Sequence, residues 1–170
     1  MTRAPFPVRE VPENLEVLEI IHSDVCGPMR NTSPGGSKYF VTFTDEKTRY
    51  SRVYFLKNKN EVLENFKIYK NEVENFTGKK IKFFQTDNGK GEYCNRVFDQ
   101  FLQENGIQRR LSAPYTPQQN GLAERMNRTL LEKARCMMTD ANVPPSLWAE
   151  AVHTANYLRN RTPSRSLNHE

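Results

Sequence analysis

The stretch from residue 38 to residue 57 reads KYFVTFTDEKTRYSRVYFLK, and it indicates the class of fold. Its two halves, 38–45 and 50–57, are rich in aromatic and β-branched residues with a two-residue periodicity. That pattern is typical of β-strands, and the short turn DEKTR between them favours antiparallel pairing. The preceding segment Leu15–Ser23, LEVLEIIHS, is also β-branched and ends near Asp24. The sequence therefore predicts a meander of three antiparallel strands.

The periodicity changes after residue 60, where apolar residues recur at intervals of three and four. This spacing predicts a helix with Gly78 as its C-cap, and its expected buried stripe is Val62, Phe66, Tyr69, Val73 and Phe76. Residues 81–86, IKFFQT, then predict a short fourth strand that ends before the turn residues Asp87-Asn88-Gly89.

Four more elements follow this turn. Residues 95–105 predict a helix that ends at Gly106, with Val97, Phe98, Phe101 and Leu102 facing inward. Residues 107–111 predict a brief strand. Residues 122–139 predict a long helix whose buried stripe is Leu122, Met126, Leu130, Ala134 and Met137. The Pro144-Pro145-Ser146 step predicts a last helix through Leu158, with Ser146 as its N-cap.

The expected order is three strands, then helix, strand, helix, strand and two helices. A meander followed by alternating helices and strands is typical of an α/β fold. We expect a mixed five-stranded sheet, antiparallel in strands 1–3, with helices on its faces. In such a sheet the first and fourth strands can be neighbours, and ligand sites form at strand ends.

Length and composition restrict the classes of protein to which the chain can belong. The chain has 170 residues, enough for one domain, and we find neither a run of the ~20 apolar residues that span a membrane nor a secretory-type N-terminal stretch. The net charge of +5 suits a polyanionic partner, although many basic proteins have none. Three widely spaced cysteines, at 26, 94 and 136, form no C-x-x-C pair, so we expect no zinc site. Their odd number and wide spacing indicate a reducing compartment.

Three acidic residues differ from the others because they lie at the ends of predicted elements. Asp24 ends the first strand, Asp87 follows the fourth, and Glu124 lies in the first turn of the long helix. Neighbouring first and fourth strands would bring Asp24 and Asp87 together, with Glu124 presented to them. Converging carboxylates repel and raise their pKa values unless a cation binds. Oxygen ligands favour Mg²⁺ or Mn²⁺, and two such ions about 3.5–4 Å apart suit phosphodiester chemistry.

Each acid also has a purely structural interpretation. Asp87 could begin an Asp-Asn-Gly turn, Glu124 could be a first-turn helix acid paired with Arg128, and Asp24 could cap a strand end. His22 shares a strand face with Asp24, where it could assist a metal site or simply be packed and hydrogen-bonded. The motifs around the acids decide between these interpretations.

Those motifs carry a family resemblance. The segments HSDVCGPM, FTDEKTRY, QTDNGKGEY, PYTPQQNGLAERMNRTL and LWAEAVHTANYLRNR resemble the integrase core of copia-type LTR retrotransposons, over roughly residues 15–165. The string PYTPQQNGLAERMNRT is the most specific of them. The resemblance implies a ribonuclease H-like fold, related to retroviral integrases, and a D,D-35-E catalytic triad. By motif position the triad is Asp24, Asp87 and Glu124. Here thirty-six residues, 88–123, separate the last two acids, and the extra residue lies in NGKGEY.

The resemblance also implies an activity. The chain would be a Mg²⁺-dependent integrase, a DNA polynucleotidyl transferase with endonuclease activity, in which Mn²⁺ can substitute and two ions bind with DNA. It would trim the 3′ ends of retrotransposon DNA and join them to target DNA. One alternative is a decayed or domesticated core that only binds DNA or protein, and another is a related nuclease that cuts RNA–DNA hybrids.

Residues near the triad are candidate DNA contacts. Arginines on the helix of Glu124 can grip phosphates or form a solvated basic face, and the resemblance implies a DNA-touching loop before that helix. Tyr115 in this loop could stack on an unpaired base. Such contacts position the DNA backbone, so we expect little base specificity. The candidates are Asn88, Lys90, Tyr115, Gln119, Asn120, Arg125, Arg128 and Arg135.

The remaining expectations concern organisation and partners. Residues 1–14 are predicted to be a linker, 15–165 the catalytic core and 166–170 a C-terminal tail. The expected partners are element-end and target DNA and further copies of the chain, as a homodimer or a higher oligomer, with no membrane and no organic cofactor. The expected location is the nucleus, with cytoplasmic particles as a further place.

Overall fold

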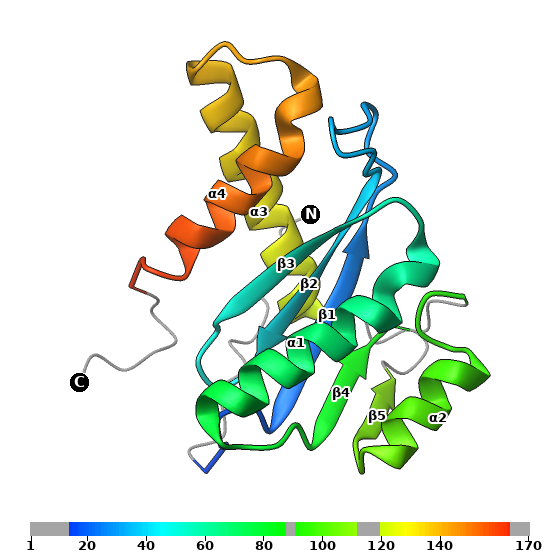
Figure 1. The fold of residues 1–170 in the computed structure, drawn as a ribbon. Coiled ribbons are helices and arrows are strands. Elements are labelled where there is room, and N and C mark those ends of the chain that lie inside the picture. The colour runs from blue at the N-terminus through cyan, green and yellow to red at the C-terminus, as the bar shows by residue number, and fades with distance from the viewer. Residues whose placement is uncertain (1–13, 88–90, 112–119, 164–170) are drawn as a thin grey trace, which may run out of the picture.

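The computed structural model describes residues 14–87, 91–111 and 120–163, and its elements follow the predicted order (Figure 1). The strands are β1 (Ile20–Cys26), β2 (Tyr39–Asp45), β3 (Ser51–Leu56), β4 (Phe83–Thr86) and β5 (Gln108–Leu111). The α-helices are α1 (Val62–Thr77), α2 (Arg96–Glu104), α3 (Gly121–Asp140) and α4 (Trp148–Arg159), and the short 3₁₀ helices are η1 (Lys59–Glu61) and η3 (Pro145–Leu147).

The five strands form one mixed sheet in the order β3-β2-β1-β4-β5. Strands β1, β2 and β3 pair antiparallel, which confirms the predicted meander. Strand β4 pairs parallel with both β1 and β5. The first and fourth strands are therefore neighbours, which is one of the arrangements that the predicted mixed sheet allows.

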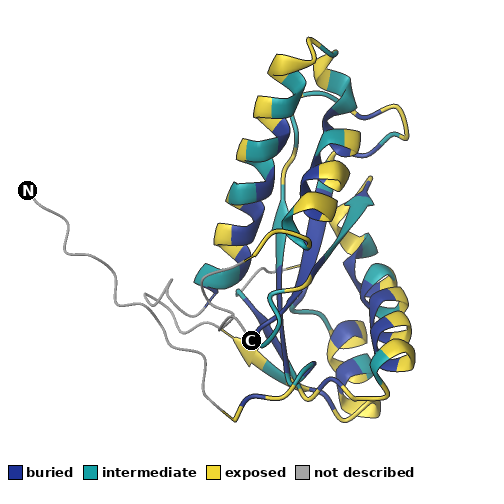
Figure 2. Ribbon diagram, turned by 90° about the vertical axis from the view of Figure 1, so that its left-hand side faces the viewer, coloured by how far each residue is buried: buried dark blue, intermediate teal, exposed yellow. Residues whose placement is uncertain are grey.

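Helices cover the sheet on both faces (Figures 1 and 2). Helices α1 and α2 lie on one face and α3 and α4 on the other, and each turns its buried side inward (Figure 2). Within the described segments, no helix is both long and apolar enough to cross a membrane. The molecule thus has three layers, and each face of the sheet has its own apolar core.

The core under α1 and α2 is built from aromatic rings. Phe66 of α1 lies 4.3 Å from Phe84 of β4 and 5.5 Å from Phe43 of β2, between ring centroids. Phe84 also packs against Tyr93, which lies just before α2 and is 1% exposed. Rings offset or tilted at these distances attract each other beyond the burial of their area. This cluster fixes β4, and the acid that follows it, against the centre of the sheet.

The core on the opposite face joins α3 and α4 to β2 and β3. Trp148 packs against Phe40 and Phe55, and its indole nitrogen donates to the carbonyl of Asn31 at 2.8 Å. Leu130 of α3 and Val152 of α4 are fully buried in the same cluster. The long helix that carries Glu124 is thereby packed against the strands on its buried side.

Strand β1 begins later and runs further than predicted. Leu18 has a positive φ of 65°, and its N–H donates to Asp45 Oδ1 at 2.9 Å, so the chain turns before Ile20 and the apolar segment from Leu15 is not one strand. At the other end the pairing with β2 continues to Cys26. Asp24 therefore lies within the strand, opposite Thr42, and not at its end.

Three side-chain predictions on the helices are wrong. Phe76 is 91% exposed, because the buried stripe of α1 ends with Val73 and the last turn has no core to face. Val97 is 66% exposed, since Phe98 and Leu102 carry the buried face of α2. Ser146 caps no helix, because η3 occupies Pro145–Leu147 and leads directly into α4.

The outer strand β3 is held at its first residue by α4. Asn160 Oδ1 accepts from the N–H of Ser51 at 3.0 Å, and Asn160 Nδ2 donates to the carbonyl of Ser51 at 2.8 Å. Asn156 Nδ2 donates to the same carbonyl at 2.9 Å. One side-chain amide thus satisfies both main-chain groups of Ser51, as a neighbouring strand would.

Candidate active site

The first candidate acid, Asp24, is held from α3 by a single amide. Asn127 Nδ2 donates to Asp24 Oδ2 at 3.0 Å and is 3.3 Å from the carbonyl oxygen of Asp24. Asn127 Oδ1 in turn accepts from the hydroxyl of Thr42 on β2 at 2.7 Å. Asn127 is 4% exposed. Asn127 therefore joins α3 to β1 and β2 beside Asp24.

The second acid, Asp87, directly follows β4. The parallel register sets His22 of β1 opposite Gln85 of β4, so the same register continued by two residues brings Asp87 beside Asp24. The third acid, Glu124, is exposed in the first turn of α3. The three acids therefore come from three elements that are adjacent in space.

The pKa of Asp24 reflects the proximity of the two other acids. Its pKa is raised from 3.8 to about 7, first because burial disfavours the charged form, and then because the charges of Asp87 and Glu124 repel it. The hydrogen bonds from Asn127 and from the backbone of Val25 lower the pKa without restoring it. Asp24 thus lies in the field of both other acids, as the sequence analysis expected of a shared site.

The three acids do not lie close enough together to form a metal site in this structure. In the described segments no three His, Cys, Asp or Glu side chains lie close enough together to hold one ion. The donor chemistry nevertheless fits a hard cation, because carboxylate oxygens are the ligands that Mg²⁺ and Mn²⁺ prefer. A cation would also relieve the repulsion that raises the pKa of Asp24.

His22 is engaged away from the acids. Its Nε2 lies 2.9 Å from Glu46 Oε2, and both side chains are buried. The backbone N–H of Glu46 donates to the carbonyl of Ile20, which attaches the turn after β2 to β1. The structural interpretation of His22, a packed and hydrogen-bonded side chain, is the one that the structure bears out.

Asn120 is buried, which does not fit its prediction as a DNA contact. It was a candidate DNA contact, but it is 1% exposed, and its Nδ2 lies 3.4 Å from the carbonyl oxygen of Ser23. Its backbone carbonyl accepts from the N–H of Glu124 at 3.2 Å. Asn120 is therefore not available to DNA in this structure, and it anchors the start of α3 to the strand that carries Asp24.

The other DNA-contact candidates divide into two groups. Arg125, Arg128 and Arg135 are exposed on α3. The charge of Arg135 also acts on the thiol of Cys26, although burial and Asp24 together leave the pKa of that thiol raised. The second group, Asn88, Lys90, Tyr115 and Gln119, lies outside the described residues.

Asn127 is the site residue that sequence reasoning missed. A signal was available, because Asn127 follows Glu124 by three residues and so lies on nearly the same face of α3. An asparagine inside a helix and beside an apolar stripe is a polar group that must find a partner. The motif drew attention to the charged residues, whereas the neutral amide makes the contact with Asp24.

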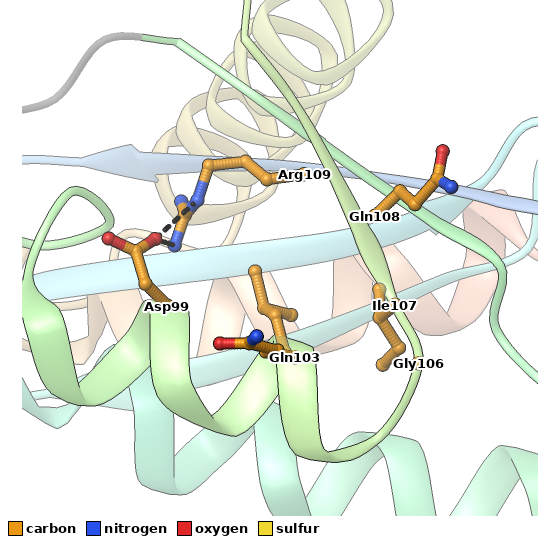
Figure 3. A pocket seen from close by; sticks show the side chains of 7 residues that line it. Asp99, Gln103, Gly106, Ile107, Gln108 and Arg109 are labelled. Carbon is orange, nitrogen blue, oxygen red and sulfur yellow. Dashed lines mark hydrogen bonds and ion pairs between the residues drawn. The ribbon is translucent and has the colours of Figure 1, made fainter.

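A separate hollow lies between α2 and β5 (Figure 3). It contains none of the three acids. Arg109 donates from Nε to Asp99 Oδ1 at 3.0 Å at one side of it, and its guanidinium lies over the ring of Phe98. The remaining lining residues are Leu102, Gln103, Gly106, Ile107 and Gln108. The two charged residues that line the hollow, Asp99 and Arg109, pair with each other.

The chain is similar to known integrase core domains. Two family models described as integrase core domains match residues 15–117 and 105–160. The Retrovirus-related Pol polyprotein from transposon TNT 1-94 of Nicotiana tabacum is 50% identical over 150 residues, which are 88% of this chain and 11% of that protein. The Transposon Ty1-NL2 Gag-Pol polyprotein of Saccharomyces cerevisiae is 32% identical over 151 residues, 88% of this chain and 9% of that one.

The fold also has a solved counterpart. A chain in the cryo-electron microscopy structure of the simian T-cell lymphotropic virus intasome in complex with PP2A regulatory subunit B56 gamma matches with a TM-score of 0.63. It is 19% identical, and the match covers 82% of this chain and 47% of that one. This likeness supports the ribonuclease H-like fold. The chain spans about a tenth of the length of the polyproteins it matches.

Proposed function

Because this chain belongs to the integrase core domain family, we propose that it is a metal-dependent polynucleotidyl transferase of DNA integration. In this proposal it trims the 3′ ends of retrotransposon DNA and joins the freed 3′-hydroxyls to target DNA. Asp24, Asp87 and Glu124 are its catalytic acids. The observation that carries the proposal is the position of Asp24, whose pKa is raised by burial and by the charges of the two other acids.

The three acids would hold the metal. Their carboxylate oxygens fit Mg²⁺, with Mn²⁺ as a substitute, and two ions would suit this reaction. When bound, the ions supply Lewis-acid activation of the attacking oxygen and stabilisation of the leaving oxygen. The chain's own task is to place the carboxylates. Asp24 is fixed on a central strand, Asp87 follows the neighbouring strand, and Glu124 enters from the helix.

Asn127 supports this placement. Its amide hydrogen bond fixes the orientation of the Asp24 carboxylate, which would bind an ion. Its bond with Thr42 fixes the orientation of the amide, because a hydroxyl donor requires the oxygen of Asn127 on that side. The Asn127 side chain therefore presents N–H, and not C=O, to the acid.

The exposed face of α3 is the proposed DNA surface. Arg125, Arg128 and Arg135 are exposed on the helix whose first turn carries Glu124. Guanidinium groups bind phosphate oxygens in pairs, so these residues would position the DNA backbone beside the acids without reading its sequence. Assembly with further copies of the chain, and action in the nucleus, belong to the same proposal.

A branched oligonucleotide tests the proposed chemistry. The reverse of joining, called disintegration, needs only a cleavage and a ligation within one substrate, so it can be followed with the 170-residue chain and Mn²⁺. We expect Asp87→Asn and Glu124→Gln to abolish the reaction, a loss of at least about 100-fold, because metal-supporting groups contribute several kcal/mol.

The matched control is Glu132→Gln, which removes an exposed acid two turns along the same helix and is expected to leave the rate unchanged. If the wild-type chain binds the oligonucleotide but never cleaves it, the chain is a DNA-binding module. If Asp87→Asn retains the rate of the wild type, the assignment of the acids is wrong.

A further inference from the structure

A buried pair of hydroxyl groups lies in the aromatic core, next to the proposed acids. The hydroxyl oxygens of Ser23 on β1 and Tyr93 before α2 are 2.8 Å apart. Ser23 is fully buried and Tyr93 is 1% exposed. The ring of Tyr93 packs against Phe84 and Phe98, so the hydrogen bond is a polar contact within an apolar cluster.

The two residues belong to the segments that carry two of the acids. Ser23 directly precedes Asp24, and Tyr93 follows Asp87 by six residues in the segment that leads from β4 to α2. The hydrogen bond therefore connects the strand of the first acid with the segment that begins at the second acid. It does so on the face of the sheet opposite to α3.

Strand β1 is thus held from both sides at consecutive residues. Asn127 of α3 bonds Asp24 from one face, and Tyr93 bonds Ser23 from the other. Neighbouring side chains on a strand point to opposite faces, so the two contacts together restrict rotation of the strand about its axis. A rotation of that kind would change the direction in which the carboxylate of Asp24 points.

We infer that the Ser23–Tyr93 hydrogen bond is a positioning link that sets the distance and direction between Asp24 and Asp87 for metal binding. The inference rests on the proposed function, because it assumes that these acids share metal. A phenylalanine and an alanine would fill the same core without burying polar atoms. A hydrogen bond between two hydroxyls is directional, so it fixes the relative position of Ser23 and Tyr93 more closely than apolar packing does.

Tyr93→Phe and Ser23→Ala test the inference, since each removes one hydroxyl and leaves most of the packing. Binding of Mn²⁺ to the 170-residue chain is measured from the loss of the free-ion signal in electron paramagnetic resonance, which does not depend on catalysis. We expect each variant to bind Mn²⁺ about tenfold more weakly, the lower end of the effect of groups that orient metal ligands. The double variant should be no weaker than either single one, because both remove the same bond.

Tyr69→Phe is the matched control. Tyr69 belongs to the same core and is fully buried, and its hydroxyl has no hydrogen-bond partner within the described segments. Removing that hydroxyl should leave Mn²⁺ affinity unchanged. Thermal unfolding followed by circular dichroism establishes that every variant is folded at the temperature of the titration.

The outcomes separate the two proposals. If the wild-type chain binds no Mn²⁺ at millimolar concentration, the proposed function fails and the inference fails with it. If the wild-type chain binds Mn²⁺ and folded Tyr93→Phe binds it equally well, the positioning link is wrong while the proposed function stands. An equal weakening by Tyr69→Phe would also overturn the inference, because the effect would then come from the core in general.

Discussion

Asp24 combines a cost in stability with a role in the proposed chemistry. Folding raises its pKa from 3.8 to about 7, so between these pH values the folded chain keeps a proton that the unfolded chain has released. The free energy of unfolding therefore contains a contribution that is fully present below pH 4 and is lost as the pH rises through 7. At neutral and higher pH the ionised acid destabilises the fold.

Asp24→Asn should remove this cost. In a metal-free buffer at pH 8 we expect the variant to be more stable than the wild type by about 2 kcal/mol, because each pKa unit corresponds to about 1.4 kcal/mol and partial exposure reduces the total. Urea unfolding between pH 4 and 8 measures the difference in the free energy of unfolding between the variant and the wild type. Glu132→Gln, which removes an exposed acid on α3, serves as the control. Identical pH profiles for Asp24→Asn and the wild type would contradict the prediction.

Asn127→Ala should damage both stability and activity. The substitution leaves the Thr42 hydroxyl and one Asp24 oxygen without their partner, and an unsatisfied buried group costs about 1–3 kcal/mol. We expect a lower urea midpoint and a slower Mn²⁺-dependent disintegration reaction. Thr42→Val removes only the hydroxyl that orients the amide, so its effect on the rate should be smaller. A destabilised Asn127→Ala variant with an unchanged rate at saturating Mn²⁺ would show that the amide is only structural.

The junction between α1 and β4 depends on one carboxylate. Glu74 is 7% exposed, and it accepts from Lys70 and Lys80 at 3.0 and 2.8 Å and from the backbone N–H of Ile81 at 3.1 Å. Burial raises the pKa of Glu74, but the hydrogen bonds from Lys80, Ile81 and Lys70 outweigh burial, and the pKa is lowered overall. This carboxylate therefore stabilises the fold above its unfolded pKa, and the contribution is lost as the pH falls through its folded pKa.

Glu74→Gln should lower the free energy of unfolding at pH 7 by about 1–3 kcal/mol, the range for a hydrogen-bonded charge that loses its interactions. The difference from the wild type should be smaller at pH 3, because protonation removes the charge of Glu74 progressively as the pH falls. Urea unfolding at the two pH values provides the measurement. The control is Glu64→Gln on the same helix, whose ion pair with Lys67 is largely exposed and contributes little. An effect of Glu74→Gln that is equal at both pH values would rule out the carboxylate as its cause.

The elements themselves were largely predictable from local pattern. Aromatic alternation identified β2 and β3, and the spacing from Val62 to Val73 together with Gly78 identified α1. Errors arose where a tertiary contact overrides the local pattern. Leu18 follows the apolar pattern of a strand, but the bond to Asp45 places it in a turn. Phe76 follows the stripe of α1, but the core ends one turn earlier.

On the scale of the whole molecule, the sequence indicated which acids lie in neighbouring elements but not how they are held. The meander and the alternating helices allow the first and fourth strands to be neighbours, and the observed order β3-β2-β1-β4-β5 places them side by side. The contact of the Asn127 amide and the burial of Asn120 were not predictable, because each depends on a partner about a hundred residues away in the chain. The position of Asn127 beside the apolar stripe of α3 indicates that its amide has a partner, but a neutral polar residue gives no charge pattern that identifies this partner.

The proposed metal site should couple the stability of the whole chain to pH. Mn²⁺ at about 100 times its dissociation constant contributes about 2.7 kcal/mol, which corresponds to a rise in melting temperature of about 5–10 °C for a chain of this size. We expect this rise at pH 8 and a smaller one at pH 6, because Asp24 then holds a proton that competes with the ion. Differential scanning calorimetry with Mn²⁺ and with a chelator measures it. The Asp24→Asn variant should show almost no rise, and a larger rise at pH 6 than at pH 8 would refute the coupling.

The contact between α4 and Ser51 has a practical consequence for handling the protein. An open strand edge is a template on which a second chain can add, and proteins that expose one tend to aggregate or exchange segments. Asn160 and Asn156 occupy the main-chain groups with which such growth would begin on β3. A shortened version that ends before Asn156 would lose both amides together with the last third of α4. Fragments designed for crystallisation or binding studies should therefore extend past Asn160 to avoid aggregation.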